Sequence, residues 1–205
     1  MMATTHVLVG VALAAVTAVV APEFAIAALL GGAVGGLFPD LDLYAGHRKT
    51  LHFPVYYSLL AFGGLFVAAL APTVLTVGVA LFLLSAAIHS RMDAFGGGLE
   101  LKPWLGESDR AVFDHHNARW IEPRRWIRYD GAPEDLVLAG AMAVPGLLVF
   151  DGVIQQIVVG ILIVSTGYAL VRKPMVYLTQ HLVDFLPLSV LSYVPARFID
   201  DFESA

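Results

Sequence analysis

Seven side chains of the kinds that commonly bind metal ions lie at the ends of long apolar segments of this chain. They are four histidines and three aspartates, namely His6, Asp40, Asp42, His47, His52, His89 and Asp93. Mixed imidazole and carboxylate ligands suit Zn²⁺, Mn²⁺ or Fe²⁺ better than Ca²⁺ or Mg²⁺. Seven ligands exceed one tetrahedral shell, so the pattern predicts one or two divalent ions, Zn or Mn, with further residues supporting the ligands.

The local spacing of these residues favours a shared site. His89 and Asp93 are four residues apart, so both side chains point from one face of a helix. Asp40 and Asp42 follow a proline, and an extended Asp-Leu-Asp segment would aim both carboxylates the same way. The alternative interpretation is that these residues form helix caps and interfacial hydrogen bonds. Cysteine is absent, so thiolate ligands do not enter the argument.

Three apolar stretches must position the seven side chains, and they cover residues 7–38, 54–88 and 136–171. Each is about twice as long as one membrane span, and each has a turn sequence near its middle: Ala21-Pro22-Glu23, Ala71-Pro72-Thr73 and Phe150-Asp151-Gly152. If each stretch is a helical hairpin that crosses the bilayer and returns, all seven side chains lie on one membrane face.

The composition indicates a membrane protein. The chain is 58% hydrophobic and only 14% charged, with a mean hydropathy of +0.76, whereas soluble domains have about a quarter charged residues. We expect a single all-α, polytopic membrane domain over residues 1–205. About six transmembrane helices form three hairpins, over residues 4–38, 54–90 and 136–171. A cytoplasmic insert covers residues 91–135, and an interfacial C-terminal helix covers residues 174–202. A cleaved signal peptide is the alternative for the first span, but no basic residue precedes it.

The basic residues predict the orientation. All twelve Lys and Arg residues fall on the side of the model that carries the seven side chains, and the three opposite turns hold none. By the positive-inside rule, this face and both termini are cytoplasmic, as in a multi-pass protein of the cell inner membrane. The expected partners are membrane lipids and a small-molecule or lipid substrate. The arginines lack the clustered basic surface that nucleic-acid binding requires.

The polar insert over residues 91–135 is too long for a simple connection. Its aromatic residues suit a membrane–water interface, and it is placed to cover the predicted site as a lid. It contains the adjacent histidines His115 and His116, whose side chains would point about 100° apart on a helix. At most one of them would then join a metal site, and the favoured interpretation is that both are surface residues. His181 and Asp184, near the C-terminus, are also interpreted as surface residues.

Several of these motifs together resemble the YdjM-like family of inner-membrane metal-dependent hydrolases, some of which are described as LexA-binding. The resemblance covers residues 4–98 and rests on Thr5-His6, Pro39-Asp40-Leu41-Asp42, His47-Arg48, His52 and His89-x-x-x-Asp93. The family usually has Thr-His-Ser at the second loop histidine, where this chain has Leu51-His52-Phe53. The resemblance implies a membrane-bound hydrolase.

Metal-dependent hydrolysis is therefore the predicted activity, with a lipid-like or phosphorylated ester as the substrate. Asp42 and Arg48 are the candidates for a direct part in catalysis. The Arg48 guanidinium can hold a phosphate or carboxylate of the substrate, and a contact with a lipid head group is the alternative role for it. The alternative is a metal-binding transport, sensor or scaffold protein that catalyses nothing. A transporter would need polar residues near the bilayer midplane, and the predicted midplane residues are apolar.

Overall fold

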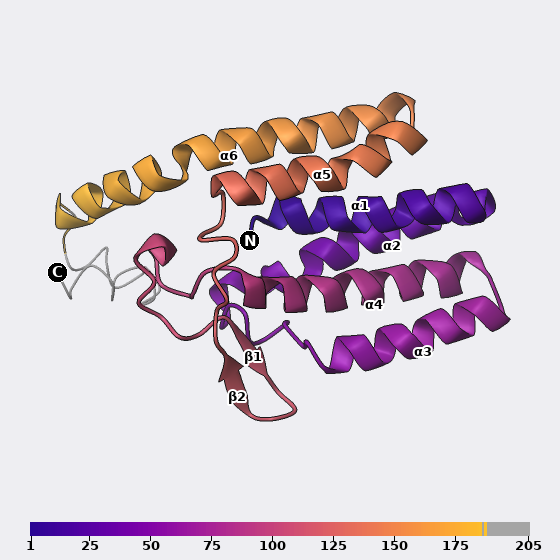
Figure 1. Cartoon of the computed structure of the whole chain (residues 1–205), viewed down its shortest axis with the longest axis horizontal. Helices are drawn as coiled ribbons and strands as arrows, with labels where there is room; N and C mark the ends of the chain where they lie inside the picture. Colours follow the sequence, from indigo (N-terminus) through magenta and orange to yellow (C-terminus); the bar gives the residue numbers. More distant parts are fainter. Residues whose placement is uncertain (186, 188–205) are drawn as a thin grey trace.

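The computed structural model describes residues 1–185 and 187 of the chain. Within them, six α-helices form three hairpins: α1 (Ala3–Val20) with α2 (Ala25–Leu37), α3 (Tyr56–Leu70) with α4 (Val74–Met92), and α5 (Pro133–Val149) with α6 (Gly152–Phe185). The helices run side by side, and the turns inside the three hairpins all lie at the same end of the molecule (Figure 1). The predicted all-α class and the three hairpins are therefore confirmed.

Each hairpin turn forms where the sequence breaks its apolar run. The first contains a 3₁₀ turn, η1 (Pro22–Phe24), which begins with a proline. In the second, Thr73 and Thr76 form a reciprocal capping box at the start of α4. In the third, Gly152 has a positive φ of 56°, a conformation that glycine adopts without steric cost.

Four segments of the described chain are long and apolar enough to cross a membrane, which supports membrane association: Ala3–Val20, Pro22–Tyr44, Val74–Phe95 and Gly152–Leu182. The helix Tyr56–Leu70 is apolar but shorter. Helix α5 has 17 residues and carries Glu134 and Asp135 in its first turn. Large side chains such as Phe62 and Leu148 are 77% and 80% exposed, as expected for helices that face lipid.

Glycines let α1, α2 and α4 approach one another closely. A Cβ added to Gly32 would lie 2.4 Å from the carbonyl oxygen of Gly10 on α1, and one on Gly36 would lie 2.4 Å from that of His6. On another side of α2, a Cβ on Gly35 would lie 2.2 Å from the carbonyl oxygen of Phe82 on α4. Small residues therefore place α2 directly between two helices that carry predicted metal ligands.

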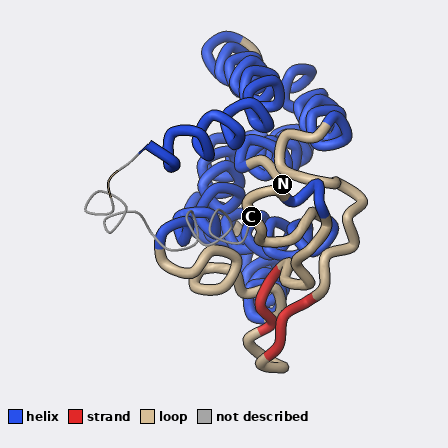
Figure 2. The backbone as a smooth tube through the Cα atoms, turned by 90° about the vertical axis from the view of Figure 1, so that its left-hand side faces the viewer, coloured by secondary structure: helices blue, strands red, loops and turns tan. Residues whose placement is uncertain are grey.

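The 91–135 insert lies at the end of the bundle opposite the hairpin turns. It contains the 3₁₀ turns η3 (Asp93–Phe95) and η4 (Pro103–Leu105) and the antiparallel strands β1 (Val112–Asp114) and β2 (Arg119–Ile121). Viewed from that end, its loops and strands lie in front of the helix ends (Figure 2). The two short strands are a β element that the all-α prediction did not include.

The C-terminal segment differs from the prediction. A separate interfacial helix was expected to begin at residue 174, but α6 continues through Pro174 to Phe185. At this level Arg172 donates to Asp130 Oδ2 at 2.8 Å and to the carbonyl oxygen of Leu101 at 3.2 Å, which joins α6 to the insert. His181 is exposed as expected, whereas the Asp184 side chain and nearly all of the segment after Phe185 lie outside the described part of the chain.

Candidate metal centre

Four of the seven predicted side chains form one compact group, called here the ligand group: Asp40, His52, His89 and Asp93. Asp40 lies in the 3₁₀ helix η2 (Phe38–Tyr44) that follows α2, and His52 lies in the loop before α3. His89 is near the end of α4, and Asp93 begins η3 one helical turn later. One ligand atom from each side chain lies within 4.8 Å of the others, so the group could hold a metal ion.

The distances within the ligand group match those around a metal ion. The Nε2 atom of His52 lies 3.2 Å from Nε2 of His89 and 3.3 Å from Oδ2 of Asp93. Oδ1 of Asp40 lies 3.4 Å from His89 Nε2 and 3.8 Å from His52 Nε2. Ligand atoms at 2.0–2.2 Å from a tetrahedral ion are separated by roughly 3.3–3.6 Å. The observed separations therefore need little adjustment to enclose one ion.

The hydrogen bonds on the far sides of the two imidazole rings set their tautomers. His89 Nδ1 donates to the carbonyl oxygen of Gly36 at 2.6 Å, and His52 Nδ1 donates to Oδ2 of Asp42 at 3.0 Å. In neutral rings, both Nε2 atoms then carry lone pairs that face each other and the two carboxylates. In that form four acceptors converge, and either a proton on one Nε2 or a divalent cation satisfies the arrangement.

Asp42 holds the loop that carries His47 and His52. Its Oδ1 accepts hydrogen bonds from His47 Nδ1 at 3.0 Å and the Arg48 backbone at 3.3 Å, and its Oδ2 accepts from Leu51 and His52. The expected extended Asp-Leu-Asp segment is instead a 3₁₀ helix, so Asp40 faces the ligand group while Asp42 faces the loop. The structure thus places Asp42 behind His52 rather than beside Asp40.

His6 lies behind the ligand group, on α1. Its Nε2 donates to Oδ1 of Asp93 at 3.1 Å, and its ring stacks on that of His89 with the centroids 3.7 Å apart. Its Nδ1 is buried and has no hydrogen-bond partner within residues 1–185 and 187. His6 therefore contacts two members of the ligand group without joining it, although the sequence predicted it as a ligand.

His47 lies beside the ligand group, where it donates a hydrogen bond to Asp42 and its ring meets that of His52 edge-on. Its ring lies 5.8 Å from that of His52, and its side chain is 21% exposed. Burial lowers the pKa of His47 below its ordinary value, and the hydrogen bond to Asp42 opposes this shift only in part. The structure thus places His47 beside Asp42 and outside the four-residue ligand group, and a direct bond from His47 to the metal stays a prediction.

Arg48 brings a positive charge to the edge of the ligand group. Its backbone has a positive φ of 58°, a strained conformation for a residue with a side chain. Its Nε lies 3.5 Å from Oδ2 of Asp93, and its Nη1 donates to the carbonyl oxygen of Gly97 at 2.8 Å. The guanidinium therefore compensates part of the carboxylate charge and ties the loop to the insert.

The ligand group is closed on most sides and open at Asp40. The side chains of His52, His89 and Asp93 are at most 2% exposed, whereas that of Asp40 is 17% exposed. The insert covers part of the loop, because His115 Nε2 donates to the carbonyl oxygen of Lys49 at 2.7 Å. Asp40 is therefore the most accessible side chain of the ligand group.

Sequence reasoning missed the carbonyl of Gly36, which fixes the tautomer of His89, because a backbone acceptor has no residue-type signature. It placed His115 and His116 outside the site, as the structure does.

Comparisons with protein-family models, with curated proteins and with solved structures gave no match to this chain.

Proposed function

We propose that this protein is a membrane-bound, metal-dependent hydrolase whose divalent ion is held by Asp40, His52, His89 and Asp93. The observation that carries the proposal is the convergence of two imidazole Nε2 atoms and two carboxylates, all within 4.8 Å of one another, with three of the four side chains buried. Each imidazole is oriented by an acceptor behind it, as in known metal centres. With both rings neutral, such an arrangement of acceptors is unfavourable in the protein interior unless a cation is bound.

The donor set suits Zn²⁺ or Mn²⁺. When bound, the ion would supply a water nucleophile at neutral pH and would polarise the bond to be cleaved. The residues support this chemistry in distinct ways. Asp42 holds His52, and Gly36 holds His89. The exposed edge of Asp40 leaves an approach for the substrate, which a purely structural metal site does not need.

The membrane arrangement supports an amphiphilic ester as the substrate. In the proposed topology, six helices cross the inner membrane, both termini are cytoplasmic, and the ligand group lies at the cytoplasmic membrane face. Leu41, the residue after Asp40, is 63% exposed, so apolar surface adjoins the open edge of the ligand group. A lipid-like or phosphorylated ester would reach this edge with its apolar part in the bilayer.

Arg48 is proposed to assist with an anionic part of the substrate. Its guanidinium lies 3.5 Å from Asp93 Oδ2, so it is close enough to the ligand group to contact a bound phosphate or carboxylate. Replacing Arg48 by Ala should therefore raise KM more than it lowers metal content, whereas replacing a ligand removes both metal and activity.

The proposal is tested with the full-length protein in vesicles, loaded with Zn²⁺ or Mn²⁺ and assayed against lipid and soluble phosphoesters and carboxylic esters. We expect hydrolysis by the wild type and by the exposed-surface control His116→Ala, and none by His89→Ala or Asp93→Ala, although all four insert into the membrane. A metal-loaded wild type that cleaves nothing in this panel would contradict the hydrolase proposal and favour a metal-binding sensor, transport or scaffold protein.

A further inference from the structure

The two short strands of the insert and the turn between them, called here the β ribbon, lie against the loop that carries His52. The ribbon is at the ligand-group end of the bundle, next to the start of α3 (Figure 1). Its register pairs Asp114 with Arg119, so His115 begins the turn that follows β1. The sequence predicted only a surface position for His115, but the structure shows contacts from this side chain to both sides of His52.

Two hydrogen bonds join the β ribbon to the loop just before His52. The backbone N–H of Phe113 donates to the carbonyl oxygen of Arg48 at 2.9 Å, and His115 Nε2 donates to that of Lys49 at 2.7 Å. Arg48 has a positive φ of 58°, and such a strained backbone persists only where surrounding contacts fix it. The two bonds therefore help to hold the loop in this conformation.

The ring of His115 also packs on the residue just after His52. Its centroid lies 4.5 Å from that of Phe53, and the two planes are inclined by 33°. One side chain thus bridges Lys49, three residues before His52, and Phe53, one residue after it. His115 therefore opposes any movement of this segment away from the ligand group.

Asp42 holds the same loop from the inner side. Its carboxylate accepts hydrogen bonds from the backbone N–H groups of Arg48 and Leu51 and from His52 Nδ1. The loop is consequently fixed by Asp42 on one side and by the β ribbon on the other. Between these contacts, the side chain of His52 is fully buried, and its Nε2 lies 3.3 Å from Oδ2 of Asp93.

We infer that His115 is a positioning residue of the metal centre, which keeps residues 47–53 in place so that His52 Nε2 faces the other ligands. The inference rests on the proposed function, because it takes His52 as a metal ligand. It gives the insert a part in supporting the centre as well as covering it. The neighbouring residue His116 is the matched comparison, because it is exposed and its ring lies 6.4 Å from that of Tyr56 on α3.

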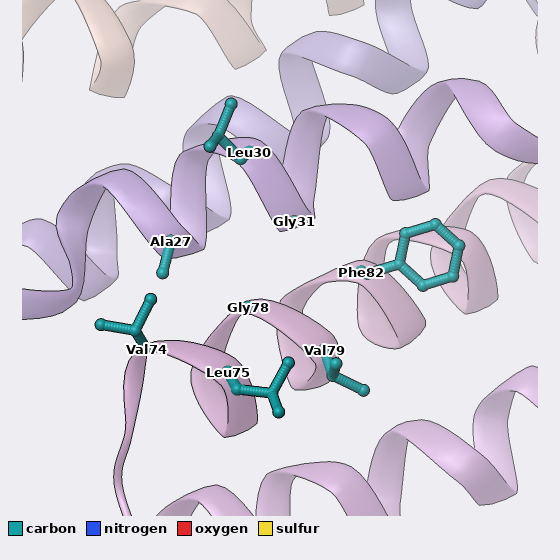
Figure 3. Close-up of a pocket in the computed structure, with 8 residues that line it drawn as sticks. All are labelled: Ala27, Leu30, Gly31, Val74, Leu75, Gly78, Val79 and Phe82. Atoms are coloured by element: carbon teal, nitrogen blue, oxygen red, sulfur yellow. The ribbon is translucent and has the colours of Figure 1, made fainter.

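A variant at the far end of α4 separates positioning from general stability. Figure 3 shows this end, where Val74 and Gly78 lie beside α2 along a shallow apolar groove. Val77, between them, is buried in the helix core and lies twelve residues before His89, which corresponds to about 18 Å along the helix. Val77→Ala removes buried methyl groups and should lower the melting temperature without moving the His52 loop.

The first measurement is hydrogen–deuterium exchange of the metal-free full chain in phosphatidylcholine vesicles. The backbone N–H groups of residues 48–51 all donate to Asp42 or Gly46, so their exchange reports whether the loop keeps its conformation. We expect peptides over residues 47–53 to exchange several-fold faster in His115→Ala than in the wild type, and at the wild-type rate in His116→Ala. Equal exchange in His115→Ala and the wild type would overturn the inference.

The second measurement is metal affinity, together with the visible spectrum of the Co²⁺-loaded protein, which depends on the number and arrangement of the ligands. His115→Ala should change the spectrum and weaken affinity by about 10-fold, the lower end for residues behind metal ligands. His115→Gln should recover most of this loss, because its amide can still donate to Lys49. Val77→Ala should keep the wild-type affinity and spectrum. A His115→Ala variant that only melts earlier, as expected of Val77→Ala, would overturn the inference.

The two measurements separate this inference from the proposed function. Faster loop exchange in His115→Ala, with no metal bound by the wild type, would support the positioning of His52 by His115 and contradict the metal centre. Metal binding and ester hydrolysis by the wild type, with unchanged exchange and affinity in His115→Ala, would support the hydrolase and overturn the inference.

Discussion

The Nε2 atoms of His52 and His89 lie 3.2 Å apart in the protein interior, although each ring uses its Nδ1 to donate to an acceptor behind it. Two neutral imidazoles in these tautomers cannot hydrogen-bond to each other. The nearby carboxylate oxygens of Asp40 and Asp93 are also acceptors. A bound cation resolves this arrangement, and the variants below test how the surrounding residues maintain it.

Gly36 is expected to be essential for helix packing and for the orientation of His89. In Gly36→Ala, the added Cβ would lie 2.4 Å from the carbonyl oxygen of His6, so α1 and α2 must separate. We expect a loss of about 1–3 kcal/mol of stability, as for other overpacked sites, and a lower metal affinity. Thermal unfolding and metal titration of the reconstituted protein measure both. Gly63→Ala is the control, because a Cβ at Gly63 would meet nothing within 4 Å in the described structure. Equal behaviour of the two variants would contradict the packing argument.

Asp42 is expected to support metal binding without being a ligand. In Asp42→Asn, one oxygen is replaced by an amide that cannot accept the hydrogen bonds now made to it. The loop and His52 should lose their fixed orientation, and metal affinity should fall by about 10–100-fold, which is typical of residues behind metal ligands. Asp114→Asn provides a control, because Asp114 caps a turn in the insert through His116 and Asn117. A complete loss of metal from Asp42→Asn would instead assign Asp42 as a ligand.

The burial of His47 predicts that the stability of the folded protein decreases at acidic pH. Its pKa is lowered in the folded protein, mainly by burial, so the unfolded state binds a proton more readily. The contribution of His47 to stability is therefore complete at neutral pH and is lost as the pH falls below about 6.5, the ordinary histidine pKa. Melting temperatures of wild type and His47→Gln, compared between pH 8 and pH 5, should show a smaller acid-induced decrease in the variant. An identical decrease would show that His47 does not contribute.

The proposed topology predicts which segments are cytoplasmic. Reporter domains fused after Glu23, Thr73 or Asp151 should be found outside the cytoplasm, and reporters in the 91–135 insert should be found inside it. The insert carries seven of the twelve basic residues, while the turns carry none. An insert located outside the cytoplasm would reverse the orientation and move the ligand group to the opposite face.

The hairpins could be predicted from the sequence because each apolar run is interrupted once, at Pro22, Pro72 or Gly152. Their common direction brings distant residues to one end, which is why the convergence of the predicted ligands was also accessible. Which of the predicted residues face the ligand group and which support it from behind could not be predicted from the sequence. Whether Asp40 or Asp42 faces the ligand group depends on the 3₁₀ geometry of η2, and residue spacing alone does not determine those dihedral angles.

Two other features escaped the sequence for different reasons. Pro174 was expected to begin a new helix, but α6 continues through it. A proline in a helix removes one hydrogen bond and is tolerated where tertiary contacts compensate. Just before it, Arg172 joins α6 to the insert. The strands β1 and β2 are only three residues long, too short for an alternation of polar and apolar residues to be recognised.

Metal content of the purified full-length protein tests the central claim most directly. After loading with Zn²⁺ or Mn²⁺ and removal of free ion, the wild type and His116→Ala should retain bound metal in equal amounts. His52→Ala and His89→Ala should each lose it, with affinity reduced by more than the roughly 100-fold expected for a residue behind the ligands. A wild type that retains no metal, or a His89→Ala variant that retains as much as the wild type, would contradict the assignment of this group as a metal centre.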